Sequence, residues 1–257
     1  MAANPIAIVT GGGRGIGRMI ALLLAQQGHS VVVAGPDTTE LQQTAADAQG
    51  VGMPSLAVVA DVTREEQVQA LAERTLREFG RINVLVNNAG VIGPTALVPN
   101  VAKEDWDHVL AVNLTGAFLC CKAVLPAMMA RRSGKIINIS SVAGKMAYAL
   151  RSPYAVSKWG LIGLTLTLAK EMGPYSIQVN AVCPGPVRGE RMERIIRQRA
   201  AELGQTPEQV EKTYLETMAL KRFVEPHDVA AMVAHLASSF GNNITGQTFD
   251  VTAGYGL

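Results

Sequence analysis

The sequence predicts an α/β fold of three layers, in which helices cover both faces of a doubly wound parallel sheet. Short β-branched runs alternate with longer amphipathic stretches, and repeated βαβ units of this kind form parallel sheets. The short runs are almost continuously apolar, as strands are when both faces of their sheet are covered. Seven of them are expected to be strands, at residues 6–9, 31–34, 56–59, 82–86, 135–139, 177–182 and 248–252.

The stretches between these strands predict helices. Residues 18–27 follow the first strand, and residues 67–79 carry apolar side chains close to one helical stripe. A further helix is expected over 153–172. Ser152 would be its N-cap and Pro153 its first residue, where proline is favoured.

Two predicted helices, 109–129 and 153–172, are apolar over most of their circumference. A helix that is apolar nearly all round is buried nearly all round. One face can cover the sheet, whereas the other needs a second cover, and a partner subunit is the simplest one. We therefore expect a homo-oligomer, either a dimer or a homotetramer.

Length and composition favour one large α/β domain over residues 1–257, since single domains of about this size are routine. Hydrophobic residues make up 48% and charged residues 17%, which allows a sizeable core. The net charge is +2 and no dense Lys/Arg block occurs, so neither nucleic acid nor a membrane surface is expected as a partner. The variable segment 188–223 is expected to cover the ligand site.

The expected location is the cytoplasm. Residues 1–5 lack the charge and the apolar run of a signal peptide. Three cysteines, at positions 120, 121 and 183, do not form a disulfide framework and are expected to be reduced. The apolar segment 109–130 is interrupted by polar residues and is a poor membrane span.

A glycine-rich turn follows the first predicted strand and precedes the first predicted helix. It reads Thr10-Gly11-Gly12-Gly13-Arg14-Gly15-Ile16-Gly17. Glycines let backbone N–H groups approach a pyrophosphate, and the helix N-terminus adds a favourable dipole. The flanking strand and helix favour a Rossmann-type dinucleotide site over a turn that binds nothing.

The end of the second predicted strand bears on the choice of cofactor. A carboxylate there binds the ribose 2′-OH of NAD, whereas an arginine accommodates the 2′-phosphate of NADP. Gly35 carries no charge, and Asp37 lies beyond a proline, from where it could still swing in. Arg14 could meet a 2′-phosphate or could be a solvated loop residue. The cofactor is therefore expected to be NAD or NADP, with the balance toward NADP.

Tyr154 and Lys158 stand four residues apart on a predicted helix and share a face. A phenol has an ordinary pKa of about 10 and is a poor acid–base group at neutral pH. An ammonium group about 4 Å from a phenolate interacts with it by about 4 kcal/mol at an effective dielectric of 20, enough to lower a phenol's pKa by up to about three units. The pair suits proton exchange with a carbonyl or alcohol, although the same spacing occurs in ordinary surface pairs.

Ser140 and Ser141 follow the fifth predicted strand, at the edge where ligands bind in open α/β sheets. A hydroxyl group there can hydrogen-bond a substrate oxygen and stabilise the charge that develops on it. The alternative is that both serines only cap the strand.

The whole chain, over about residues 5–254, resembles the single-domain form of the short-chain dehydrogenase/reductase family. The resemblance rests on motifs that occur in the family's order, and together they are far more specific than any one alone. They are the turn over 10–17, Asp61-Val62, Asn87-Asn88-Ala89-Gly90, Asn113, Ser141 with Tyr154-x3-Lys158, and Pro184-Gly185. One departure is Gly189, which stands where relatives often have a threonine that contacts the nicotinamide carboxamide.

The resemblance implies an NAD(P)-dependent oxidoreductase that interconverts a secondary alcohol and a ketone. Tyr154 would be the general acid in reduction and the base in oxidation, while Lys158 would hold the nicotinamide ribose and favour loss of the Tyr154 proton. Ser141 would orient the substrate carbonyl, and Asn113 would position a water in a proton relay. The implied cofactor contacts are Gly11, Gly13, Arg14, Gly15, Ile16, Gly17, Asp61, Val62, Asn87, Ala89, Gly90, Tyr154, Lys158, Pro184, Gly185 and Val187.

The expected substrate contacts combine the catalytic hydroxyl groups with an apolar wall. They are Ser141, Met146, Tyr148, Arg151 and Tyr154. Arg151 is a candidate for recognising an acidic substrate. Arg191, Arg194 and Arg197 recur at three-residue steps, either as an anion-binding lid or as a solvated helix face.

Two other functions remain open. A 3-oxoacyl-[acyl-carrier-protein] reductase shares every motif named above. A dinucleotide-binding sensor or scaffold would keep the fold without catalysis, although it has no physical need for the catalytic set. The histidines show no metal-ligand spacing, so no metal is expected.

Overall fold

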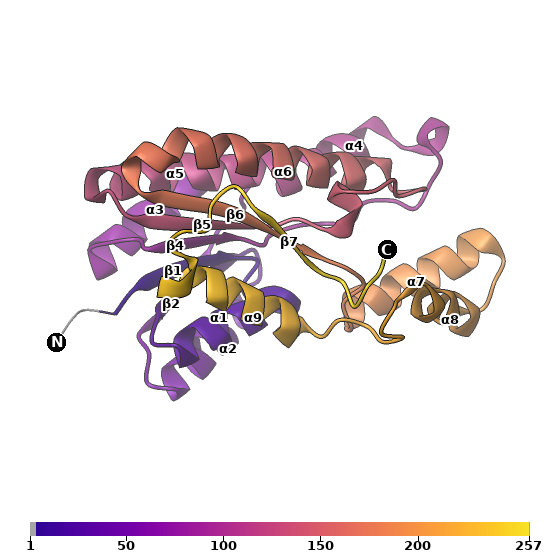
Figure 1. The fold of residues 1–257 in the computed structure, drawn as a ribbon, viewed down its shortest axis with the longest axis horizontal. Coiled ribbons are helices and arrows are strands. Elements are labelled where there is room, and N and C mark those ends of the chain that lie inside the picture. The colour runs from indigo at the N-terminus through magenta and orange to yellow at the C-terminus, as the bar shows by residue number, and fades with distance from the viewer. Residues whose placement is uncertain (1–3, 257) are drawn as a thin grey trace.

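The computed structural model describes residues 4–256 and contains the expected parallel sheet (Figure 1). The strands stand in the order β3-β2-β1-β4-β5-β6-β7, and every neighbouring pair is parallel. Their bounds are β1 Ile6–Thr10, β2 Ser30–Gly35, β3 Ser55–Val59, β4 Val84–Asn87, β5 Gly134–Ile139, β6 Ile177–Pro184 and β7 Thr248–Val251. The doubly wound α/β fold predicted from the sequence is confirmed.

Helices cover both faces of this sheet, which makes the three layers of Figure 1. Helices α1, α2 and α9 pack on one face, and α3, α5 and α6 pack on the other. The helical bounds are α1 Gly15–Gln26, α2 Thr38–Gly50, α3 Glu65–Phe79, α4 Lys103–Leu110, α5 Gly116–Arg131, α6 Ser152–Met172, α7 Glu190–Leu203, α8 Pro207–Thr217 and α9 Pro226–Ala237.

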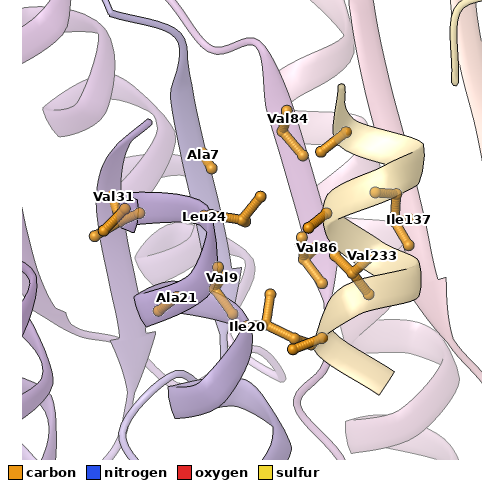
Figure 2. Close-up of a cluster of buried hydrophobic side chains, with 14 of the residues drawn as sticks. Ala7, Val9, Ile20, Ala21, Leu24, Val31, Val84, Val86, Ile137 and Val233 are labelled. Atoms are coloured by element: carbon orange, nitrogen blue, oxygen red, sulfur yellow. The ribbon is translucent and has the colours of Figure 1, made fainter. Parts of the chain in front are cut away.

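The central strands are apolar at successive positions because each of their faces meets a different helical layer. In β1, Val9 belongs to the cluster with α1 and α9, whereas Ile8 belongs to the cluster with α3, α5 and α6. Figure 2 shows part of the first cluster, with Leu24 of α1 and Val233 of α9 placed against the strands. Successive side chains along a strand thus contribute to two separate cores, one on each face of the sheet.

The structure differs from the predicted helices in several places. Helices α2, α4, α8 and α9 were not predicted; in α2, few apolar residues mark the buried side. The helix expected over 109–129 is interrupted by a π-helical turn, Ala111–Thr115, that joins α4 to α5. Ser152 is the first residue of α6 rather than its N-cap, and its hydroxyl group is buried without a partner.

Residues 188–223 contain the helical pair α7 and α8, which stands beyond the carboxyl ends of the strands (Figure 1). The pair has a small core of its own, in which Met192 and Ile196 of α7 meet Val210 and Tyr214 of α8. A capping box at Thr206 starts α8, since its side chain accepts from the Gln209 amide and the Gln209 side chain accepts in return.

One continuous helical stretch, Lys103–Arg131, is long and apolar enough to cross a membrane by length and composition alone. Half of its most apolar window is buried inside the fold, where Leu119 and Val124 contribute to the core against the sheet. Packing on the sheet therefore accounts for its apolar composition.

Candidate active site

A cavity of about 100 Å³ opens at the carboxyl ends of the strands and brings together residues from distant parts of the chain. Ligands of open α/β sheets bind at this edge, where the strand order reverses, and here the reversal lies between β1 and β4. The lining residues are Ile16, Asn88, Ile92, Ile139, Ser140, Ser141, Val142, Tyr148, Arg151, Tyr154, Lys158, Pro184, Gly185, Pro186, Val187, Arg191, Met192, Ile195 and Tyr255.

The glycine turn is held tightly against the loop that follows β4. The Asn88 side-chain amide donates to the carbonyls of Thr10 (3.0 Å) and Gly11 (3.1 Å). The Thr10 hydroxyl accepts from the backbone amides of Asn88 and Ala89, at 3.0 and 3.1 Å. A Cβ on Gly17 would lie 2.1 Å from the Gly11 carbonyl oxygen. Only glycine therefore allows the N-terminus of α1 to approach this turn.

Tyr154 and Lys158 lie on the first turns of α6, and both line the cavity. The Lys158 ammonium lies 5.7 Å from the centroid of the Tyr154 ring and donates to the carbonyl of Ile139 at 2.8 Å. Within residues 4–256 the Tyr154 hydroxyl has no hydrogen-bond partner. The phenol is thus open to the cavity, with a cation beside its ring.

Lys158 is 4% exposed, and the Arg191 guanidinium lies near it. Burial, with a smaller effect of the nearby Arg191 guanidinium, lowers the pKa of Lys158 to about 7. Arg191 reaches from α7 across the cleft and donates to the carbonyl of Gly90 at 2.6 Å. Two positive groups thus face the same space, which favours an anionic or hydroxyl-bearing ligand there.

Ser141 follows β5 and lines the same cavity. It caps the single helical turn Val142–Gly144 that comes after it. Its hydroxyl accepts from the amide of Ala143 at 3.1 Å, which fixes the side chain. A Cβ on Gly144 would lie 2.7 Å from the Lys158 carbonyl oxygen. The glycine therefore lets the serine turn pack directly on α6.

Asn113 lies in the π-helical turn and is buried, with both ends of its amide engaged. Its Oδ1 accepts from the amide of Val91 at 2.8 Å, while its Nδ2 donates to the Val91 carbonyl and to the Ser157 hydroxyl. π-Turns inside α-helices are frequent at functional sites. Here the amide ties the loop after Gly90 to α6, next to Lys158.

Most of the expected cofactor residues lie along this edge. Ile16 and the segment Pro184, Gly185 and Val187 line the cavity directly. Asp61 follows β3 and is not part of the lining. Its carboxylate accepts hydrogen bonds from the Thr63 backbone amide and hydroxyl. The hydrogen bond from the backbone amide holds the pKa of Asp61 below its usual range.

Within the Asn87-Asn88 pair, the two side chains point in opposite directions. The buried Asn87 amide donates to Asn138 Oδ1 (2.9 Å), away from the cavity, so its side chain fixes β4 to β5. Asn88, which sequence reasoning did not select, lines the cavity and secures the glycine turn. A pattern of two adjacent asparagines at a strand end does not tell which faces inward.

The end of β2 places no free carboxylate at the expected ribose position. Asp37 is the N-cap of α2, and its side chain accepts from the Glu40 amide at 3.0 Å. Arg14 is 72% exposed and pairs with Glu40 at 3.4 Å. This loose pair leaves the guanidinium able to turn toward a phosphate.

On the substrate side, Tyr148 and Arg151 line the cavity as expected, whereas Met146 does not and lies against Gly256. Arg151 is only 2% exposed. Sequence reasoning missed the residues behind it, Gln198, Arg199 and Tyr214, because they come from α7 and α8. Among residues 4–256 no group of His, Cys, Asp or Glu is arranged to hold a metal ion.

Comparison with known proteins points in one direction. The family described as short chain dehydrogenase matches residues 5–200. A 3-oxoacyl-[acyl-carrier-protein] reductase FabG of Staphylococcus epidermidis is 37% identical over 253 residues, 98% of each chain. An actinorhodin polyketide ketoreductase solved with NADPH has a TM-score of 0.94 at 33% identity, covering 98% of this chain and 97% of that one. An NAD⁺-bound xylitol dehydrogenase has a TM-score of 0.94 at 31% identity, covering 97% and 98%.

Proposed function

Because the chain belongs to the short-chain dehydrogenase/reductase family, we propose that Tyr154 exchanges a proton with a carbonyl or alcohol substrate in the cavity described above. The enzyme is an NAD(P)-dependent oxidoreductase, and the bound nicotinamide dinucleotide supplies or accepts the hydride. The observation that carries this function is the open phenol of Tyr154 beside the buried Lys158 at the carboxyl ends of the strands.

The residues present fit a dinucleotide. The glycine turn at the N-terminus of α1 is a cradle that a Cβ at Gly17 would fill, and helix N-termini favour phosphate groups. Pyrophosphate would lie against this turn. Lys158 would bind the nicotinamide ribose, and Pro184 and Gly185 would lie beside the nicotinamide.

Each catalytic residue has a separate task in this proposal. Tyr154 gives its proton to the carbonyl oxygen in reduction and takes it back in oxidation. Ser141, held by the Ala143 amide, orients that oxygen and stabilises negative charge on it. Asn113 keeps the loop after Gly90 against α6, close to Lys158. In this proposal a proton relay along this side of the site returns the proton to Tyr154 from solvent.

A panel of secondary alcohols and ketones, assayed with NAD(H) and NADP(H), tests this function. Absorbance of the reduced nicotinamide at 340 nm reports turnover in both directions. Turnover of at least one ketone that depends on Tyr154 is expected. If the protein binds a dinucleotide tightly but turns over nothing in the panel, a sensor or scaffold becomes the better account.

A 3-oxoacyl-[acyl-carrier-protein] reductase is a second candidate within the same chemistry. The similarity to the relative of that name from Staphylococcus epidermidis favours this candidate, since the alignment covers 98% of both chains. Assay with acetoacetyl thioesters of coenzyme A and of acyl carrier protein discriminates the two. Failure to reduce either thioester, alongside reduction of simple ketones, would exclude this candidate.

Cofactor preference is expected to favour NADP, with Arg14 meeting the 2′-phosphate. Arg14→Ala should weaken NADPH binding about tenfold and leave NADH binding within about twofold, because an exposed charge-assisted hydrogen bond contributes roughly 1–2 kcal/mol. Quenching of protein fluorescence gives both dissociation constants. Arg18→Ala, which removes an arginine of α1 that pairs with Asp47 of α2, is the matched control. Equal losses for both dinucleotides would contradict the assignment.

A homo-oligomer, dimer or tetramer, is proposed from the outer faces of α5 and α6. Large apolar side chains are about half exposed there, at Phe118, Val156, Trp159 and Leu166. Exposed apolar surface of this kind marks interfaces in soluble proteins. Light scattering at micromolar concentration should give a multiple of 27.2 kDa, and Trp159→Glu combined with Leu166→Glu should give 27.2 kDa itself. A monomeric wild type would refute the interface.

A cytoplasmic location is proposed on the state of the cysteines. Cys120, Cys121 and Cys183 are buried free thiols. Burial raises the pKa of Cys121 to about 12 and of Cys183 to about 11, so both stay protonated and unreactive. Reduced thiols of this kind suit a reducing compartment.

A further inference from the structure

Arg151 is a buried cation without a counter-ion, next to the proposed catalytic tyrosine. It directly precedes α6 and is 2% exposed, yet no carboxylate of residues 4–256 forms an ion pair with it. Its guanidinium donates to two neutral acceptors, the Gly93 carbonyl at 3.0 Å and the Gln198 side-chain oxygen at 3.3 Å. Buried charges in proteins are ordinarily paired, because an unpaired one loses its hydration without compensation.

The surroundings of Arg151 add a second cation and no anion. Arg199 of α7 donates to the Tyr214 hydroxyl at 3.5 Å, and the Tyr214 hydroxyl lies 3.3 Å from that of Tyr148. Burial lowers the pKa of Arg151, the Tyr148 and Tyr214 phenols act to raise it, and the charge of Arg199 acts to lower it. Two guanidinium groups and two phenols thus gather at this side of the cavity, with Arg151 and Tyr148 in its lining, an arrangement that a negative ligand would stabilise.

The backbone directs Arg151 into this setting. Leu150, the residue before it, has a φ of 65°, a left-handed conformation that is strained for a leucine. The Leu150 carbonyl accepts from the Ala96 amide at 3.0 Å, which ties the segment to the loop that carries Gly93. Strain of this kind persists where the surrounding structure over-determines it, often at ligand sites.

We propose that the substrate carries an anionic group, in the simplest case a carboxylate, which pairs with Arg151 while the substrate's carbonyl faces Tyr154. The proposal rests on the proposed function of this site and names its substrate class, an oxo acid or hydroxy acid. A guanidinium has five donors in a planar fork that matches a carboxylate, and two of the five are used by Gly93 and Gln198. A thioester offers no such charge.

Matched pairs of acid and methyl ester test the proposal, with the carbonyl at three distances from the charge. The acids are pyruvate, acetoacetate and levulinate. For at least one pair, wild-type kcat/KM should favour the acid at least tenfold. Arg151→Gln should lower kcat/KM for that acid about 10- to 100-fold, mainly through KM, because a hydrogen bond to a charged group contributes about 1.5–3 kcal/mol. The ester should change by less than about threefold.

Two further variants separate charge from structure. Arg197→Gln removes a charge from α7, the helix that carries Gln198, and should leave both rates unchanged because Arg197 is exposed and lies 4.0 Å from Glu193. Gln198→Ala removes a partner of Arg151 but keeps the guanidinium, and should preserve the preference for the acid. Equal losses on acid and ester in Arg151→Gln would show a purely structural clamp and overturn the proposal.

A binding measurement on the wild type makes the outcome independent of turnover and of the variants' folding. Calorimetric titration of the cofactor-loaded protein with butyrate and butyramide should show at least tenfold tighter binding of the carboxylate. Equal affinities overturn the proposal, while turnover of neutral ketones would still support the proposed function. If no carbonyl compound is turned over, the proposed function falls and the titration alone decides the role of Arg151.

Discussion

Tyr154→Phe is expected to lower kcat about a thousandfold with the best ketone, while leaving binding of the reduced dinucleotide within about twofold. The change removes one oxygen atom and with it the only proposed donor for the carbonyl, and general acid–base groups contribute about 10²- to 10⁴-fold to rates. The ring stays in place beside Lys158, whose nearest hydrogen-bond partner is Ile139 rather than the phenol. Cofactor fluorescence and thermal unfolding should therefore match the wild type.

Tyr175→Phe is the matched control for this result. Tyr175 lies in the short turn Gly173–Tyr175 after α6, at the opposite end of that helix from Tyr154, and is absent from the cavity lining. It should keep the wild-type kcat. An unchanged kcat in Tyr154→Phe would remove the phenol from the mechanism.

Gly17→Ala is expected to weaken dinucleotide binding at least a hundredfold and to lower the free energy of unfolding by about 2–3 kcal/mol. The added Cβ would lie 2.1 Å from the Gly11 carbonyl oxygen and 2.4 Å from the Asn88 side-chain nitrogen. Neither atom can move freely, because the Asn88 amide also holds Thr10. Overpacking of fixed atoms costs about 1–3 kcal/mol, and the turn proposed to receive the pyrophosphate must shift.

Gly50→Ala shows whether any glycine-to-alanine change has this effect. Gly50 ends α2 and has nothing within 4 Å of the position of a Cβ. The dissociation constant of the Gly50→Ala variant for the dinucleotide and its melting temperature should equal the wild-type values. A Gly17→Ala variant that binds the dinucleotide normally would contradict the placement of the pyrophosphate at this turn.

Local patterns were sufficient to predict the sheet and the residues that follow its strands. The apolar run that becomes β1 and the glycine turn after it are adjacent in sequence, so their joint role follows from spacing. The four-residue step from Tyr154 to Lys158 likewise puts both side chains on one helix face. The structure places both of them on the cavity wall.

Contacts between distant segments could not be predicted in this way. The pairing of Arg151 with Gln198 joins residues 47 positions apart, and the link from Tyr148 to Tyr214 spans 66. No periodicity reveals which arginine of α7 turns inward. Arg191, which reaches Gly90, and Arg197, which faces solvent, belong to the same three-residue pattern.

A crystal structure of the protein grown with NADP⁺ would show whether Tyr154 can exchange a proton with a substrate beside the nicotinamide. Pyrophosphate is expected at the N-terminus of α1 and the nicotinamide beside Pro184 and Gly185, with the Tyr154 oxygen facing the ring across a space large enough for a small carbonyl group. A Tyr154 oxygen turned away from the nicotinamide, or a ring packed against it with no such space, would rule out this role of Tyr154.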